Sequence, residues 1–90
     1  MAENWYVYLL RCADHSLYCG VTTDTSRRVD EHNQSNKLGA KYTRVRRPVE
    51  LAFVEVCKSR SQACQREHQI KRLSKEKKEL LVITYQATNS

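Results

Sequence analysis

Two short apolar segments joined by a turn constrain the fold of this chain more than any other feature of its sequence. Residues 5–12 read WYVYLLRC and residues 17–21 read LYCGV, and both are dense in aromatic and aliphatic side chains. Segments this short are typical of buried strands rather than of helices. Between them, Asp14 and Ser16 can satisfy the backbone groups of a tight turn. The pattern therefore predicts a β-hairpin.

The length of the turn decides whether two tyrosines of this hairpin share a face. Side chains alternate between the two faces along a strand. With an odd loop, for example residues 13–15 with Cys12 opposite Ser16, Tyr8 and Tyr18 lie on the same face, whereas an even loop separates them. Two phenols on one face can form a site, so a function for this region depends on the register.

The remaining elements follow from caps and apolar patterns further along the chain. Asp24 or Thr23 can cap a helix that runs to about Gln34. The other predicted parts are a polar lead-in at 1–4, a loop or short helical turn at 36–48, a strand at 49–57, a helix capped by Ser59 or Ser61, a short amphipathic helix at 79–83 and a frayed tail at 87–90. Ninety residues with 40% apolar content predict one domain, a small sheet covered by a few helices.

Composition narrows the classes of protein to consider. No stretch approaches the roughly 20 apolar residues of a membrane span, and the first dozen residues resemble no signal peptide. The four cysteines form no C-x-x-C pair, and their apolar neighbours favour reduced core residues over a metal site. We therefore expect a cytoplasmic protein.

Positive charge is concentrated in one segment of the chain. The formal net charge is +6, from 16 basic and 10 acidic residues. No acid occurs between His32 and Val49, whereas this run contains Lys37, Lys41, Arg44, Arg46 and Arg47. Such a run would attract a polyanion such as DNA. A merely basic surface is an equally good interpretation of the run by itself.

Four further residues are candidates for function, each with a plainer alternative. Gly20 inside a strand indicates a bulge or a close approach of another group, or it simply ends the strand. Arg28 and His32 stand four apart and share a helix face, although a surface pair of this kind is common. Glu67 interrupts an inward-facing helical stripe, where an unpaired carboxylate would be costly. Its partner could be a metal ion, or an arginine in a structural salt bridge.

Taken together, these residues resemble the GIY-YIG nuclease domain, especially its small stand-alone bacterial (YhbQ-like) members. The segment Val7-Tyr8-Leu9 precedes Tyr18-Cys19-Gly20 by ten residues, and Arg28, His32 and Glu67 follow in order. The segment GAKYT at 39–43 and the spacing Glu67-x-x-x-Lys71-x-Leu73 also match, so the resemblance covers about residues 5–82. It implies an α+β fold, a small three-stranded antiparallel sheet flanked by helices.

The resemblance also implies roles for individual residues. The implied catalytic set consists of Tyr8, Tyr18, Arg28, His32 and Glu67, with Gly20 as the motif glycine. Glu67 would hold a single Mg²⁺ or Mn²⁺, and Arg28 would bind the phosphate. Tyr8 would be the general base, a poor one at a pKa of about 10 until nearby cations lower it. Tyr18 and His32 would orient water and phosphate, or His32 would take the Tyr8 proton.

This chain departs from the family pattern at a few positions. Tyr6 stands at the first motif glycine and Cys19 at the middle isoleucine. Both positions support the backbone, so neither change removes a reacting group. The asparagine that some members place after the glutamate has no obvious match, which leaves any auxiliary phosphate contact unassigned.

The expected function is that of a metal-dependent DNA endonuclease, structure-directed and linked to repair or recombination. The residues expected to contact nucleic acid are Gly20, Lys37, Lys41, Tyr42, Arg44, Arg46 and Arg47. No separate element for reading bases is evident, so we expect recognition of backbone or shape. The alternatives are a nucleic-acid-binding module of the same fold that cuts weakly or needs a protein partner, and a basic adaptor with a vestigial site. The nuclease hypothesis requires the five catalytic side chains to gather around one cleft.

Overall fold

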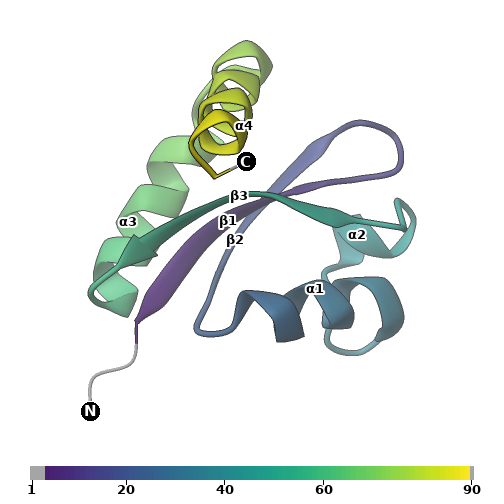
Figure 1. Ribbon diagram of the computed structural model, residues 1–90. Coiled ribbons are helices and arrows are strands. Elements are labelled where there is room, and N and C mark those ends of the chain that lie inside the picture. Colours follow the sequence, from purple (N-terminus) through teal and green to yellow (C-terminus); the bar gives the residue numbers. More distant parts are fainter. Residues whose placement is uncertain (1–3, 90) are drawn as a thin grey trace.

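A three-stranded antiparallel sheet forms the centre of the computed structural model, which describes residues 4–89 (Figure 1). The strands are β1 (Trp5–Arg11), β2 (Leu17–Thr22) and β3 (Glu50–Cys57), and β1 lies in the middle. The helices are α1 (Thr25–Gln34), the short α2 (Lys41–Arg44), α3 (Arg60–Lys71) and α4 (Lys75–Asn89). The predicted α+β class, a three-stranded antiparallel sheet flanked by helices, is confirmed.

The hairpin has the odd loop that places both phenols on one face. Tyr8 pairs with Gly20 and Leu10 with Tyr18 across β1 and β2. The Cys12 amide donates to the Ser16 carbonyl at 2.9 Å, so residues 13–15 form the loop. His15 closes it with a left-handed φ of 69°. Tyr8 and Tyr18 therefore share a face, as this register predicts.

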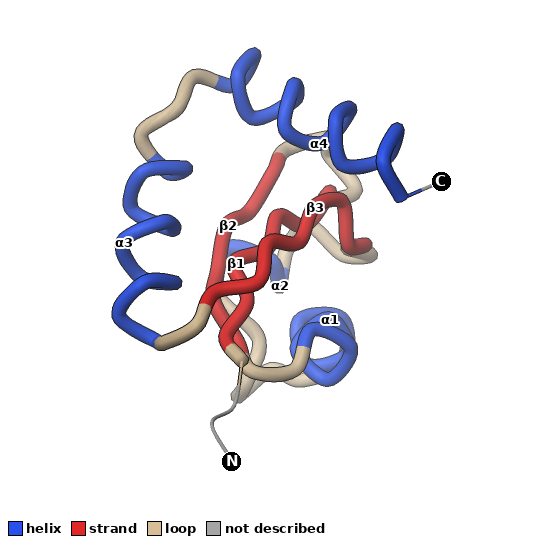
Figure 2. Tube along the Cα trace, turned by 60° about the vertical axis from the view of Figure 1, so that its left-hand side comes forward, coloured by secondary structure: helices blue, strands red, loops and turns tan. Residues whose placement is uncertain are grey.

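The two faces of the sheet are covered by different helices (Figure 2). Helices α3 and α4 cover one face, where Val7 and Leu9 of β1 pack with Ala63 and Ile70 of α3 in an apolar core. Helix α1 covers the other face, where Tyr8 and Leu10 pack with Val29. Alternate residues of β1 thus enter two separate cores.

Local capping explains where the longer helices begin. The Asp24 side chain accepts from the Arg27 amide at 3.0 Å before α1. The Ser59 hydroxyl accepts from the Gln62 amide at 3.2 Å before α3. Each bond satisfies an amide that lacks a partner within its helix. Of the alternatives that the sequence left open, the structure selects Asp24 over Thr23 and Ser59 over Ser61.

Three sequence predictions need correction. The final helix is longer than predicted, because α4 continues through residues expected to form a frayed tail and reaches Asn89. Cys64 is exposed, whereas Cys12, Cys19 and Cys57 are buried as expected, and all four are free thiols. His32 is fully buried, so it is not part of a surface pair. Most of the polar lead-in (residues 1–3) and the last residue of the tail (90) lie outside the described residues.

Within residues 4–89, none of the helices combines the length and the apolar character that crossing a bilayer requires.

Candidate active site

The motif glycine makes room for the first motif tyrosine. Gly20 lies opposite Tyr8 in the β1–β2 ladder. A Cβ atom added at Gly20 would lie 2.6 Å from Cζ of Tyr8, too close for two carbon atoms. Gly20 is therefore a site of close approach and does not end the strand. It is also buried beneath the Tyr8 ring, so it has little surface to offer nucleic acid.

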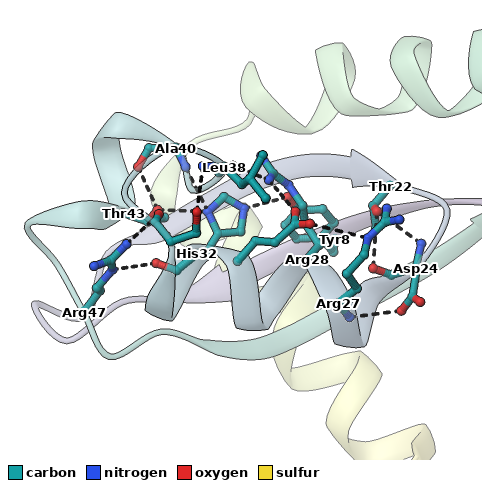
Figure 3. A network of polar contacts seen from close by, with 12 residues as sticks. Tyr8, Thr22, Asp24, Arg27, Arg28, His32, Leu38, Ala40, Thr43 and Arg47 are labelled. Carbon is teal, nitrogen blue, oxygen red and sulfur yellow. Dashed lines mark hydrogen bonds and ion pairs between the residues drawn. The ribbon is translucent and has the colours of Figure 1, made fainter.

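A buried chain of hydrogen bonds joins Tyr8 to α2 (Figure 3). The Tyr8 hydroxyl lies 3.0 Å from Nε2 of His32. Nδ1 of the same imidazole lies 2.9 Å from Oγ1 of Thr43. Tyr8 is 2% exposed, and His32 and Thr43 are fully buried. The ring of His32 is thus held at both nitrogens in a dry environment.

Burial keeps both members of the Tyr8–His32 pair neutral. Burial raises the pKa of Tyr8 to about 12, although the bond from Arg28 and its positive charge act in the opposite direction. Burial and the charge of Arg28 lower the pKa of His32 to about 4. Near neutral pH the pair is a phenol beside a neutral imidazole. Desolvation is the larger effect, so Tyr8 in the free protein is a weaker acid than an ordinary tyrosine even though Arg28 lowers its pKa.

Arg28 lies on α1 beside the Tyr8 hydroxyl and is already engaged within the protein. Its Nη1 donates to Oε1 of Glu31 at 2.9 Å and to the Leu38 carbonyl at 2.5 Å. Its side chain is 25% exposed, so one part of the guanidinium still faces solvent. An arriving phosphate would have to compete with Glu31 for this cation.

Tyr18 extends the site toward the surface through a second aromatic ring. Its ring lies 5.3 Å from that of His32 and 5.8 Å from that of Tyr42, with which it is stacked. The guanidinium of Arg46 lies over the Tyr42 ring at 3.8 Å from its centroid. These three side chains form one continuous aromatic and cationic wall next to the Tyr8–His32 pair.

The basic run divides into structural and exposed residues. Arg46 pairs with Asp14 at 3.0 Å. Arg47 donates to the carbonyls of His32 and Ser35 near the end of α1, at 2.7 and 2.9 Å. These two guanidiniums are thus engaged within the protein, and their expected role as contacts for nucleic acid stays a prediction. The exposed residues of the run whose side chains make no described hydrogen bond or ion pair are Lys37, Lys41 and Arg44.

Glu67 lies apart from the other four predicted catalytic residues. It belongs to α3, on the stripe of Ala63 and Ile70 that faces the sheet from the side opposite α1. Its carboxylate is 22% exposed and pairs with Lys71 at 3.4 Å, so the expected ionic partner is a lysine one turn away. Burial raises the pKa of Cys19 in β2 to about 11, and the negative charge of Glu67 adds to this shift.

The expected gathering of five side chains around one cleft is thus met for four of them. Tyr8, Tyr18, Arg28 and His32 meet on the α1 face, whereas Glu67 approaches β2 from the other face. However, β2 is an edge strand of the sheet, and the Glu67 charge acts on Cys19, the neighbour of Tyr18 in this strand. A half-buried carboxylate with a single lysine partner is a hard oxygen ligand that suits Mg²⁺ or Mn²⁺. Its role in metal binding stays a prediction.

Sequence reasoning missed two residues of this site. Thr43 holds the far nitrogen of His32, and Glu31 holds Arg28. The only signal for Thr43 was its place in the GAKYT segment, which carried no role of its own. Glu31 gave no signal, because an acid three residues after an arginine is ordinary on a helix surface.

Comparison with known proteins shows which family this chain resembles. The family described as the GIY-YIG catalytic domain matches residues 4–79. A UPF0213 protein of Natronomonas pharaonis is 57% identical over 82 residues, which are 91% of this chain and 94% of that protein. A UPF0213 protein of Desulfotalea psychrophila is 54% identical over 78 residues, which are 87% of this chain and 70% of that protein.

A solved structure shows the same likeness. The solution NMR structure of a UPF0213 protein from Bacillus halodurans is 44% identical to this chain and superposes with a TM-score of 0.57. The match covers 90% of this chain and 84% of that one. With its motif tyrosines, arginine and histidine assembled on one face of the sheet, the chain belongs to the GIY-YIG nuclease family.

Proposed function

We propose that this protein is an endonuclease that hydrolyses phosphodiester bonds of DNA. The observation that carries the proposal is the buried Tyr8–His32 hydrogen bond with Arg28 beside the same hydroxyl. A phenol that can pass its proton to an imidazole is a device for activating water, and a guanidinium at the same place suits a phosphate. Membership of the nuclease family supports the combination.

The proposed reaction is the attack of water on phosphorus. As the new P–O bond forms, the water proton moves to the oxygen of Tyr8 while the Tyr8 proton moves to Nε2 of His32. The bridging P–O bond breaks, and its electron pair leaves on the sugar oxygen, which takes a proton from solvent. Because the transfer is concerted, Tyr8 never carries a full charge, which fits its raised pKa of about 12. Arg28 would stabilise the charge on the phosphoryl oxygens.

The metal is part of the proposal. Glu67 would hold one Mg²⁺ or Mn²⁺ at the free edge of β2, with the substrate phosphate completing its ligands. When bound, such an ion neutralises phosphoryl charge and helps the leaving oxygen depart. A phosphate lying across this edge would have Tyr18 on one side and Glu67 on the other.

The exposed cations of the basic run are proposed to bind the DNA backbone. Lys41 and Arg44 belong to α2, the helix that carries Tyr42, and Lys37 lies in the turn before it, so these cations would meet a strand that reaches Tyr18. These groups recognise phosphates and not bases, which favours selection by DNA structure, as expected of a repair or recombination enzyme. A cytoplasmic location is part of the same proposal, and the four free thiols fit a reducing compartment.

Cleavage assays test the proposal directly. Nicked, flapped, branched and linear DNA are incubated with the protein and Mg²⁺ or Mn²⁺, and with Glu67→Gln in parallel. Cutting of at least one substrate by the wild-type chain, abolished in Glu67→Gln, is expected. Glu76→Gln on exposed α4 is the matched control and should cut normally. Cutting that survives Glu67→Gln would overturn the role of Glu67. If no substrate is cut, the proposed endonuclease activity is overturned.

A second function is favoured by two features of the site. Arg28 is held by Glu31 and the Leu38 carbonyl, and Glu67 lies on a helix that covers the opposite face. Both are features of a site that is incomplete until something rearranges it. A DNA-binding module that cuts only with a partner would bind the same DNA substrates but would not cleave them when the partner is absent.

A further inference from the structure

Thr43 occupies a position that nothing in the proposed reaction yet explains. It lies on α2, is fully buried, and contacts two groups at once. Its hydroxyl donates to the Ala40 carbonyl at 2.9 Å, and the same oxygen lies 2.9 Å from Nδ1 of His32 (Figure 3). A threonine hydroxyl has one hydrogen and two lone pairs. When this hydrogen is donated to the Ala40 carbonyl, Oγ1 can only accept toward His32.

This hydrogen-bond pattern selects one tautomer of His32. An oxygen that accepts requires a hydrogen on Nδ1, and in a neutral imidazole the other nitrogen then carries the lone pair. That nitrogen is Nε2, which lies 3.0 Å from the Tyr8 hydroxyl. Tyr8 then donates to His32, which is the arrangement in which its proton can be transferred.

A competing contact would select the opposite tautomer. The Ala40 amide lies 3.3 Å from Nδ1 and, as a donor, requires a lone pair there. With the hydrogen on Nε2, the imidazole would point a hydrogen at the Tyr8 oxygen and could not accept the phenol proton. The Thr43 contact is the shorter of the two, at 2.9 Å.

We propose that Thr43 is a positioning residue that keeps His32 in the Nδ1–H tautomer, so that Nε2 is free to accept the Tyr8 proton. The role of this relay in catalysis rests on the proposed nuclease function, whereas the tautomer is a property of the free protein. After proton transfer the imidazole carries hydrogens on both nitrogens, and Oγ1 of Thr43 still accepts the one on Nδ1. The hydroxyl therefore supports His32 before and after the transfer.

The tautomer is measured by ¹⁵N NMR of the imidazole ring in the absence of DNA. The chain has three histidines, so His15→Asn with His68→Gln leaves only the signals of His32. We expect the Nδ1–H form in this background and again with Thr43→Ser, which keeps the hydroxyl. With Thr43→Val we expect the Nε2–H form, because the Ala40 amide is then the one remaining partner of Nδ1. An Nε2–H form in the presence of Thr43, or an Nδ1–H form in Thr43→Val, would overturn the proposal.

Kinetics supply the second readout. General acid–base assistance contributes about 10²–10⁴-fold to rates, so Thr43→Val should lower kcat by at least about tenfold with KM little changed. Thr43→Ser should restore kcat to within about threefold of the wild type. Equal kcat for Thr43→Val and wild type would overturn the catalytic role. If the wild-type chain cuts no DNA, the fault lies with the proposed function, and the tautomer still decides the role of Thr43. If Thr43→Val does not fold, the tautomers of the wild-type background and of Thr43→Ser decide it.

Discussion

The two faces of the sheet use the same central strand in opposite ways. On the α3–α4 face, Val7 and Leu9 of β1 pack with apolar residues, among them Phe53 of β3. On the α1 face, Tyr8 between them is hydrogen-bonded to the fully buried His32, which in turn is hydrogen-bonded to the fully buried Thr43. One face thus relies on apolar burial, and the other on a polar network within the interior.

On the α1 face, burying the polar groups of this network carries a free-energy penalty that their hydrogen bonds must offset. A polar group removed from water needs a partner to avoid a penalty of about 1–3 kcal/mol. Within residues 4–89 no buried side-chain nitrogen or oxygen lacks a hydrogen-bond partner. The network is therefore complete, and its chemistry is tolerated because the opposite face supplies ordinary apolar packing. Stability and reactivity should accordingly respond to different substitutions.

The largest expected effect is on the apolar face. Ile70→Ala removes a fully buried side chain from the core between α3 and the sheet. It should lower the free energy of unfolding by about 2–5 kcal/mol, measured by urea denaturation. Leu80→Ala, at an exposed site on α4, is the control and should change it by less than about 0.5 kcal/mol. A similar loss in both variants would contradict the assignment of the core.

The next effect separates reactivity from stability on the α1 face. Arg28→Ala should lower the cleavage rate by about 10²–10³-fold, the loss typical of one group that stabilises transition-state charge. DNA affinity should fall only a few-fold, because one phosphate contact among several is lost. Arg27→Ala is the neighbouring control, with a side chain 57% exposed. Equal losses of rate and affinity in Arg28→Ala would argue against a catalytic Arg28.

A smaller effect should appear in the pH dependence of stability. The pKa of His32 is lowered to about 4 in the folded chain, from 6.5 for an ordinary histidine. Between these values the unfolded state binds a proton that the folded state does not, so stability falls as the pH falls through this window. At about 1.4 kcal/mol per pKa unit the loss reaches at most about 3 kcal/mol by pH 4.

Comparison with a variant isolates the contribution of His32. Urea denaturation between pH 7 and 4 should show a flatter profile for His32→Gln than for the wild type. His68→Gln, at an exposed site on α3, should keep the wild-type slope. Parallel profiles for the wild type and His32→Gln would mean that burial does not hold His32 neutral.

Much of the fold was predictable because it depends on neighbours in the sequence. The hairpin follows from alternation and from a turn of three residues, and the starts of α1 and α3 follow from Asp24 and Ser59. The length of α4 was not predictable in this way. Its last turns show no local pattern as clear as a cap, and helices in proteins are stabilised mainly by packing.

The candidate site was predictable in its members but not in its arrangement. Sequence order placed Tyr8 and Tyr18 on one hairpin and Arg28 and His32 on one helix, because strand and helix periods decide such pairs. Only the tertiary structure brought Thr43 to His32, engaged Arg47 at the end of α1 and set Glu67 on the opposite face. Contacts between distant segments depend on how whole elements pack, and no local period encodes them. The sequence thus determined the chemical groups and their nearest companions, and the packing of helices on the two faces decided which groups meet.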